Sequence, residues 1–264
     1  MVQSAERQHR DSNTKSVNKT LAILSTFDET TPMQRTSDIA VKLHMSVSTV
    51  SRHLNTMLDW GLLERDDSTG FYFPGLKIIT FAGAALSNNE VYRHAYPELQ
   101  HLSYQYGVHC HMGVPRGTDV FHLISNSCES TMDLHIPMGH CHPMYCSAMG
   151  RALLAYMQPA KVQEILRSSE LRKRTPETKI DIEEIKQELV KTRKRGYCMI
   201  FNELNEGKGS VAAAVFDRQR IPVASISIST STHSLEQLER QHELAKAVKG
   251  AARKISCKLG YYPK

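Results

Sequence analysis

The sequence lacks the short motifs that mark the common enzyme classes. It contains no GxSxG, no Walker loop, no HExxH and no GxGxxG. Ser147 and His142 form too loose a pair to indicate a nucleophile with its base. We therefore expect a protein that has no catalytic activity and needs no cofactor.

Long apolar runs are missing as well. No stretch approaches the ~20 apolar residues that span a bilayer, so no membrane partner is expected. The first 15 residues are polar and of mixed charge, without the apolar centre of a signal peptide. These features predict a cytoplasmic protein with a disordered tail over residues 1–14.

Cysteine pairs are absent too, because none of the six cysteines lies in a CxxC motif, and we expect reduced thiols. The net charge of +6 invites a nucleic-acid interpretation, but the charge is not where DNA binding would need it. Residues 1–73 hold 8 basic and 9 acidic side chains, and the basic excess lies at residues 172–174 and 191–195. Such clusters are usually solvated surfaces, so DNA binding has to be argued from local pattern.

The first part of the chain has the pattern of a helix-turn-helix. Apolar spacing predicts a helix over residues 16–27 and a short one over 37–43, which Thr36 would cap. A tight turn at 44–46 leads to a third helix that begins after Ser46. One stripe of this helix is apolar and includes Val50 and Leu54. The 264 residues leave ample length for a second domain.

A different face of the third helix carries polar side chains. Ser48, Arg52 and Asn55 are spaced i, i+4 and i+7, and side chains of these types contact base edges and phosphates. Apolar runs at 62–65 and 71–73 flank a polar turn that ends in glycine, which predicts a β-hairpin wing. A small helical domain with solvated faces is the alternative. We expect contacts to double-stranded DNA from Thr36, Ser46, Ser48, Thr49, Ser51, Arg52, Asn55 and Arg65.

Residues 75–89 form the predicted linker. Apolar residues between Leu76 and Leu86 cover nearly all sides of a helix, so another surface must bury them. That surface is either the rest of the chain or a second subunit. We favour the second subunit, because paired half-sites in a pseudo-palindromic operator require a dimer.

The remaining segment, 90–264, predicts an α+β domain. Helices are expected near the ends of an antiparallel set of strands, with a hairpin turn at 116–119. The expected strands cover 108–114, 120–127, 132–136, 211–216 and 223–229. The expected helices cover 91–106, 150–157, 161–167, 182–195 and 235–257.

Several segments together resemble the IclR family of transcriptional regulators. They are "SVNKTLAILSTF", "RTSDIAVKLHMSVSTVSRHLNTMLDWGLLERD", "GFYFPGLKI", "YCSAMGRALLAYM", "RKRGYCMIFNELNEGKGSVAAAVFD" and "VASISIS". The resemblance implies a winged helix-turn-helix over 15–74, the linker helix, and a GAF-like effector-binding and oligomerisation domain. It also implies repression of a catabolic operon by a homodimer or by a tetramer of paired dimers.

Some positions depart from the family pattern. His44 stands where the family usually has glycine, so the turn has to tolerate a side chain or bend differently. Val47 replaces a commonly basic or proline residue, and His53 replaces a leucine. Ile200 matches a position that is acidic in some relatives, which predicts a different effector.

The effector site is predicted at the start of a helix. Ser147 would cap that helix after a turn at 142–143, and the amide groups of Ala148, Met149 and Gly150 would bind a carboxylate. The strand at 223–229 alternates, with Ser225, Ser227 and Ser229 on one face, which lines a polar cavity or faces water. Family effector contacts match Ala148, Met149, Ser210, Ser227 and Ser229. We expect a small carboxylate, such as a sugar acid.

A metal site is the alternative for this domain. His109 and His111 share a strand face, and His140, Cys141, His142 and Cys146 follow. A metal-dependent enzyme or a metal sensor could be built on such ligands. The spacing is irregular, and thirteen histidines make such pairs by chance. We therefore predict no metal site and interpret these side chains as pocket or strand histidines.

Overall fold

The computed structural model describes residues 15–127 and 136–262, and the chain divides into two compact units, Met1–Asn88 and Asn89–Lys264. The two units are described separately below. The expected tail at 1–14 and all but the last residue of the expected strand at 132–136 lie outside the described residues.

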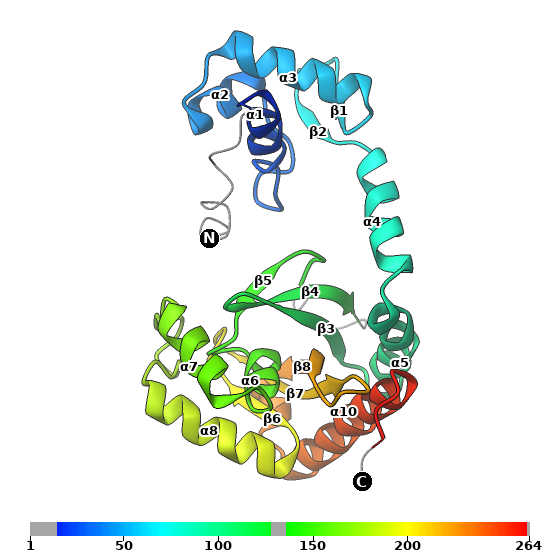
Figure 1. Cartoon of the computed structure of the whole chain (residues 1–264), viewed down its shortest axis with the longest axis vertical. Helices are drawn as coiled ribbons and strands as arrows, with labels where there is room; N and C mark the ends of the chain where they lie inside the picture. The colour runs from blue at the N-terminus through cyan, green and yellow to red at the C-terminus, as the bar shows by residue number, and fades with distance from the viewer. Residues whose placement is uncertain (1–14, 128–135, 263–264) are drawn as a thin grey trace. The chain divides into compact units, whose positions relative to one another are not determined.

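The first unit is a winged helix-turn-helix (Figure 1). Apolar side chains from its helices and its hairpin form one core, which includes Ile23, Ile39, Val50, Leu54 and Leu63. The expected order of helix, helix, turn, helix and wing is confirmed. Its elements are α1 (Lys15–Leu24), α2 (Thr36–Leu43), α3 (Val47–Asp59), β1 (Leu63–Arg65), β2 (Tyr72–Pro74) and α4 (Lys77–Ser87).

Two helix ends in this unit differ from the prediction. Helix α1 ends at Leu24, three residues earlier than predicted. The Gln34 side chain donates to the Thr26 carbonyl at 2.9 Å, which gives this backbone carbonyl beyond the helix a hydrogen-bond partner. Thr36 is not the cap of α2. Arg35 occupies that position, and its N–H donates to the Asp38 carboxylate at 3.2 Å. A β-bridge between Gln34 and Tyr72 fixes the chain immediately before it, so the helix starts one residue earlier.

His44 shows how the turn accepts a side chain. Its backbone is left-handed, with φ 53° and ψ 42°, at the end of α2. The Met45 N–H donates to the Ala40 carbonyl at 2.9 Å and closes the helix end. This is the conformation for which glycine is usually selected, so the turn keeps its geometry and carries the strain of a Cβ atom.

Helix α4 contains no buried residue in the described chain. The side chains of Leu76, Ile79 and Phe81 are 73%, 65% and 58% exposed. Apolar surface of this extent on one helix is unusual in a monomer.

The second unit is built on an antiparallel sheet of six strands in the order β5-β4-β3-β8-β7-β6. Helix α6 packs on one face of this sheet, and α5 and α10 pack side by side on the other (Figure 1). The strands are β3 (His109–Arg116), β4 (Asp119–Asn126), β5 (Cys141–Pro143), β6 (Cys198–Phe201), β7 (Lys208–Phe216) and β8 (Pro222–Ser231). The helices are α5 (Glu90–Tyr106), α6 (Ala148–Leu154), α7 (Pro159–Ser168), α8 (Ile182–Arg195), α9 (Thr232–Leu235) and α10 (Leu238–Lys258).

The α+β class is confirmed, and several element bounds change. The expected turn at 142–143 is edge strand β5, and the short strand β6 had not been predicted. Helix α6 starts at Ala148 and ends at Leu154, before two tight turns at Tyr156 and Met157. The long closing helix is interrupted. Ser231 caps the short α9 by accepting from the Ser234 N–H, and the extended Gln237 separates α9 from α10.

Candidate DNA-binding and effector-binding sites

Helix α3 begins with a hydroxyl network at its cap. The Ser46 side chain accepts from the Thr49 N–H at 3.3 Å, which confirms it as the cap, and its oxygen lies 2.8 Å from the Thr49 hydroxyl and 3.2 Å from the Ser48 hydroxyl. These contacts hold the first turn of the helix in place. Ser46 and Ser48 remain exposed at the surface.

The polar face of α3 is open. Arg52 and Asn55 are exposed, Thr49 and Ser51 are half-buried, and no described residue forms an ion pair with Arg52. On the opposite side, Val50, Leu54 and Met57 are buried in the core. The helix therefore presents a polar surface from a rigid support, as groove recognition requires.

Two further expected DNA contacts lie outside α3. Thr36 is half-buried in the first turn of α2. Arg65 is exposed at the end of β1, and its guanidinium lies 5.5 Å from the centre of the Tyr72 ring. A cation–π contact of this kind attracts the guanidinium to the ring.

His53 is a buried contact that the sequence had shown only as an unusual residue. Its Nδ1 lies 2.8 Å from the Thr20 hydroxyl of α1. The Thr20 hydroxyl already donates to the Ser16 carbonyl, so the Nδ1–H of His53 is the donor. Burial, together with Arg52 and Lys19, holds the pKa of His53 below its usual value of 6.5.

In the second unit, the start of α6 is tightly built. The Ser147 hydroxyl donates to the Pro143 carbonyl at 2.8 Å and accepts from the Gly150 N–H at 3.1 Å, so the expected cap is confirmed. A Cβ atom at Gly150 would overlap the backbone of Met144. Glycine is therefore required for α6 to approach the chain that precedes it.

The serine face of β8 is buried, not open to water. Ser225, Ser227 and Ser229 are 0%, 3% and 7% exposed, on the face that α6 covers. The Ser229 hydroxyl lies 2.9 Å from that of Ser210 on β7, and the Ser225 hydroxyl donates to the Ala213 carbonyl at 3.1 Å. The topology thus brings the expected residues Ser210, Ser227 and Ser229 to the same side of the sheet as α6.

A buried ion pair anchors α6, and sequence reasoning had missed it. The Arg151 guanidinium donates to both oxygens of Glu203, at 2.7 and 2.6 Å, and its Nε donates to the Tyr145 carbonyl at 2.7 Å. Lys179 approaches the same carboxylate at 3.4 Å. Although burial opposes the charged form, Glu203 raises the pKa of Arg151. Both residues lie in the quoted family segments, which was the only available signal.

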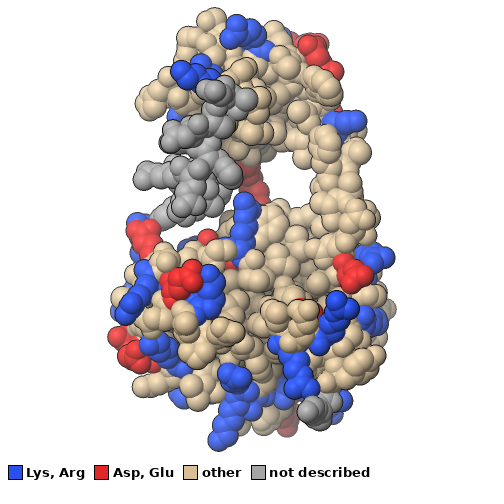
Figure 2. Space-filling model, viewed as in Figure 1, with Lys and Arg blue, Asp and Glu red and all other residues tan. Residues whose placement is uncertain are grey.

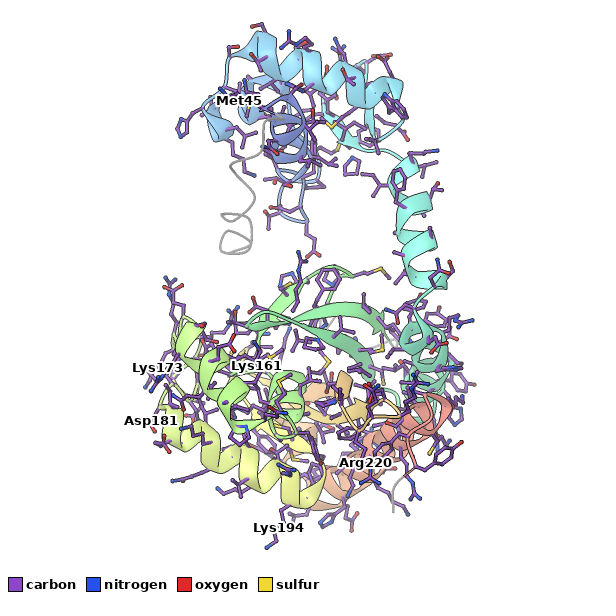
Figure 3. The ribbon with its side chains drawn as sticks, viewed as in Figure 1. Met45, Lys161, Lys173, Asp181, Lys194 and Arg220 are labelled. Atoms are coloured by element: carbon purple, nitrogen blue, oxygen red, sulfur yellow. The ribbon has the colours of Figure 1, made fainter. Side chains whose placement is uncertain are left out.

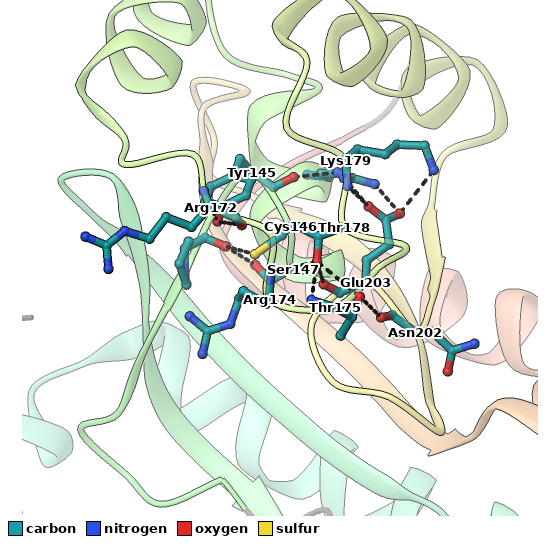
Figure 4. A network of polar contacts seen from close by, with 12 residues as sticks. Tyr145, Cys146, Ser147, Arg172, Arg174, Thr175, Thr178, Lys179, Asn202 and Glu203 are labelled. Atoms are coloured by element: carbon teal, nitrogen blue, oxygen red, sulfur yellow. Dashed lines mark hydrogen bonds and ion pairs between the residues drawn. The ribbon is translucent and has the colours of Figure 1, made fainter.

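Hydrogen bonds connect the surrounding loops to the residues around this ion pair (Figure 4). The Thr178 hydroxyl donates to the Glu203 carbonyl at 2.6 Å, and the Thr175 hydroxyl donates to the Asn202 carbonyl at 2.6 Å. The Tyr145 hydroxyl donates to the Arg172 carbonyl at 2.6 Å. These contacts make the support of α6 a single polar network.

Histidines continue the polar face of the sheet across β3, β4 and β5. His109, His111, His122 and His142 are buried, and Nδ1 of His142 lies 3.0 Å from Nε2 of His122. Burial is the largest cause of a fall in the pKa of His122 and of His142 to about 3, and neighbouring imidazoles add to it.

The ligand types considered for a metal do not converge. Within residues 15–127 and 136–262, no three His, Cys, Asp or Glu side chains are placed to hold a metal ion. Burial raises the pKa of Cys146 to about 11, which disfavours the thiolate that a metal would need.

The basic clusters lie on solvated surfaces. Lys173 and Lys194 are exposed and point away from the second unit in Figure 3. Lys191 pairs with Glu188 at 2.8 Å, and Arg172 pairs with Glu170. On the face of this unit shown in Figure 2, basic and acidic side chains are interspersed. Among the helices of the described chain, none is long and apolar enough to cross a membrane.

Two known protein-family models match this chain, one for each of its units. Residues 16–67 match the IclR helix-turn-helix domain, and residues 83–257 match the C-terminal domain of bacterial transcriptional regulators of the IclR type. The chain is 28% identical over 259 residues to the HTH-type transcriptional regulator KdgR of Escherichia coli K12, covering 98% of each. It is 26% identical over 240 residues to the E. coli K12 repressor AllR, covering 91% of this chain and 88% of AllR.

Solved structures give the same result. Thermotoga maritima IclR superposes with a TM-score of 0.80 at 28% identity, covering 93% of this chain and 99% of that one. An IclR homologue from Microbacterium hydrocarbonoxydans, solved in complex with 4-hydroxybenzoate, shares the fold with a TM-score of 0.81 at 22% identity, covering 92% and 98%. These relatives are transcriptional regulators and not enzymes, and the chain belongs to the IclR family of bacterial transcriptional regulators.

Proposed function

We propose that this protein is a repressor of a catabolic operon that leaves its operator when a small carboxylate binds. Residues 15–74 would read DNA, 75–89 would join the subunits, and 90–264 would bind the effector and complete the oligomer. The observation that carries the proposal is the pairing of an open polar face on α3 with a buried polar face on the sheet beneath α6. The first suits a DNA groove and the second suits an enclosed small molecule.

The DNA contacts would centre on Ser48, Arg52 and Asn55. These side chains are exposed on one face of α3, with Ser46, Thr49 and Ser51 beside them and Thr36 and Arg65 at the margins. A gel shift with the intergenic DNA upstream of the protein's own gene tests this. Binding should survive a chelator, and a loss of binding on chelation would favour the metal-sensor alternative instead.

The operator would be a pseudo-palindrome read by at least a dimer. Support comes from α4, which has no buried residue within the described chain and whose side chains of Ile79 and Phe81 are mostly exposed. A second copy would bury them across a two-fold axis. Light scattering at micromolar concentration should show a dimer or a tetramer, and a monomer there would remove this part of the proposal.

The effector would bind between α6 and the serine face. Its carboxylate would meet the amides of Ala148 and Met149, because the Gly150 N–H is already held by Ser147. Gly150 would contribute by allowing close backbone approach, and hydroxyls of the ligand would bond Ser227 and Ser229, with Ser210 behind them.

A thermal-shift screen of small carboxylic acids, 4-hydroxybenzoate among them, would test this site. For an acid that binds, Ser227→Ala should weaken binding by about 0.5–1.5 kcal/mol, the value of one neutral hydrogen bond, and leave DNA binding intact. Ser225→Ala is the matched control, because the Ser225 hydroxyl already donates within the protein. An uncharged effector, or equal binding by Ser227→Ala, would show that the site is misplaced.

A further inference from the structure

A line of four imidazoles runs from the surface of the second unit into its interior. His140 is exposed, His142 is 8% exposed, and His122 and His111 are fully buried. The ring centres are 4.8 Å apart from His140 to His142, 4.9 Å from His142 to His122, and 6.0 Å from His122 to His111.

This line joins the serine face. His111 on β3 lies directly opposite Ser227 on β8, so the two side chains share a face of the sheet. Gly113 lies opposite both His122 on β4 and Ser225 on β8, which places His122 on that face as well. The polar face therefore extends from Ser229 across four strands to β5, beyond the part that the proposed carboxylate and serine contacts use.

The hydrogen bond between His122 and His142 has a chemical consequence. Each neutral imidazole carries one N–H, and the bond between Nε2 of His122 and Nδ1 of His142 uses one of the two protons. If His122 donates, its Nδ1 is left as an acceptor and His142 is left with a donor. If His142 donates, His122 is left with a donor and His142 with an acceptor. In either arrangement the pair offers one donor and one acceptor.

The inner end of the pair lacks a partner. Nδ1 of His122 is buried and has no hydrogen bond to any described residue. A buried polar atom left unpaired costs about 1–3 kcal/mol, so a bound group at this position would be favoured. A carboxylate accepts but does not donate, so it cannot satisfy both ends of the pair. A hydroxyl both donates and accepts, so hydroxyls satisfy the pair in either arrangement.

We propose that His122 and His142 form a hydroxyl-binding subsite of the effector pocket, so that the effector is a hydroxylated acid and not a simple or purely aromatic one. This inference rests on the proposed carboxylate effector. Burial lowers the pKa of both histidines to about 3, which keeps the pair neutral at physiological pH and agrees with a neutral partner.

Matched pairs of acids test the subsite. Binding of glycerate, threonate and gluconate is compared by calorimetry with that of propionate, butyrate and hexanoate, their deoxy counterparts. The full-length wild-type protein is compared with His122→Phe, with the double variant His122→Phe/His142→Phe, and with His122→Asn, which keeps a donor and an acceptor. His101→Phe is the control, because His101 is an exposed histidine on α5. Circular dichroism confirms that each variant is folded.

The expected result is that at least one hydroxylated acid binds the wild type at least tenfold more tightly than its deoxy counterpart. Both phenylalanine variants should lose most of that preference, with the remainder due to Ser227 and Ser229, and should bind the deoxy acid as before. His122→Asn should retain more of the preference than they do. Acids that bind with no hydroxyl preference, or with a preference that the phenylalanine variants keep, would overturn the subsite and leave the carboxylate effector standing. Failure of every acid to bind would overturn both.

Discussion

The two units of this protein place their polar side chains in opposite positions. In the first unit, α3 holds its apolar stripe in the core and exposes Ser48, Arg52 and Asn55. In the second unit, the sheet buries serines and histidines on the face that α6 covers. An exposed polar face can contact a large charged partner with little rearrangement, whereas a buried one suits a small molecule that the protein encloses.

The energetic consequences differ accordingly. Replacing an exposed side chain on α3 should remove a proposed contact to DNA and leave the fold intact. The serines and histidines on the covered sheet face of the second unit are buried, so each is favoured by a partner within the protein or by a ligand. Stability and function should therefore separate cleanly in the first unit and should be coupled in the second.

The largest effect is expected at the buried ion pair. Arg151→Ala leaves the Glu203 carboxylate buried without its main partner, which should destabilise the second unit by about 3–5 kcal/mol. The matched control is Arg172→Ala, whose partner Glu170 is exposed, where a change below about 1 kcal/mol is expected. Denaturant unfolding gives the free energy of unfolding of both variants, and hydrogen exchange of α6 amides shows whether the loss is in the second unit. Equal effects would refute the idea that burial sets the cost in this unit.

Two glycine substitutions test the same contrast between buried and exposed positions. Gly150→Ala forces a Cβ atom into the backbone of Met144 and should destabilise the second unit by about 1–3 kcal/mol or more. Gly250→Ala in α10 is at an exposed position, meets nothing within 4 Å and should stabilise that helix by about 0.5–1 kcal/mol. Thermal unfolding of the two variants should shift in opposite directions. A shift in the same direction would mean that one of the two helices is packed differently.

On the open face, function should be lost without stability. Arg52→Ala should weaken specific DNA binding by about 1–3 kcal/mol and leave the unfolding transition unchanged. Arg167→Ala makes the same substitution at an exposed site in α7 and is the control. Fluorescence anisotropy with labelled DNA gives the affinities. A folded Arg52→Ala protein that binds as tightly as the wild type would remove Arg52 from the interface.

The smallest effect concerns His53, the one buried histidine among the described residues of the first unit. Its pKa is lowered in the folded protein, so below pH 6.5 the unfolded chain takes up a proton that the folded unit resists. The stability of the first unit should therefore fall as the pH drops below 6.5. His53→Leu should flatten this dependence in hydrogen exchange of α3, and His101→Leu should not. If the pH dependence of stability is unchanged in His53→Leu, other titratable groups cause that dependence.

The difference between the units also explains what the sequence could predict. The 3.6-residue period of α3 separates core from surface, so its exposed face followed directly from the spacing. Strand alternation separated Ser227 from Ile226 but could not say that both faces are covered, because the covering helices lie far away in sequence. Arg151 and Glu203 are 52 residues apart, and no local pattern pairs them. The short strands β5 and β6 were missed because three or four residues carry little periodicity.

The central claim is that a ligand in the second unit controls the DNA contact of the first. Anisotropy of labelled upstream DNA, titrated with protein in the absence and presence of an acid that binds, tests it directly. The account predicts at least a tenfold loss of DNA affinity in the wild type with the acid present. Ser227→Ala should bind the same DNA normally but need more acid to release it. DNA affinity that does not change when the acid is bound would contradict the account.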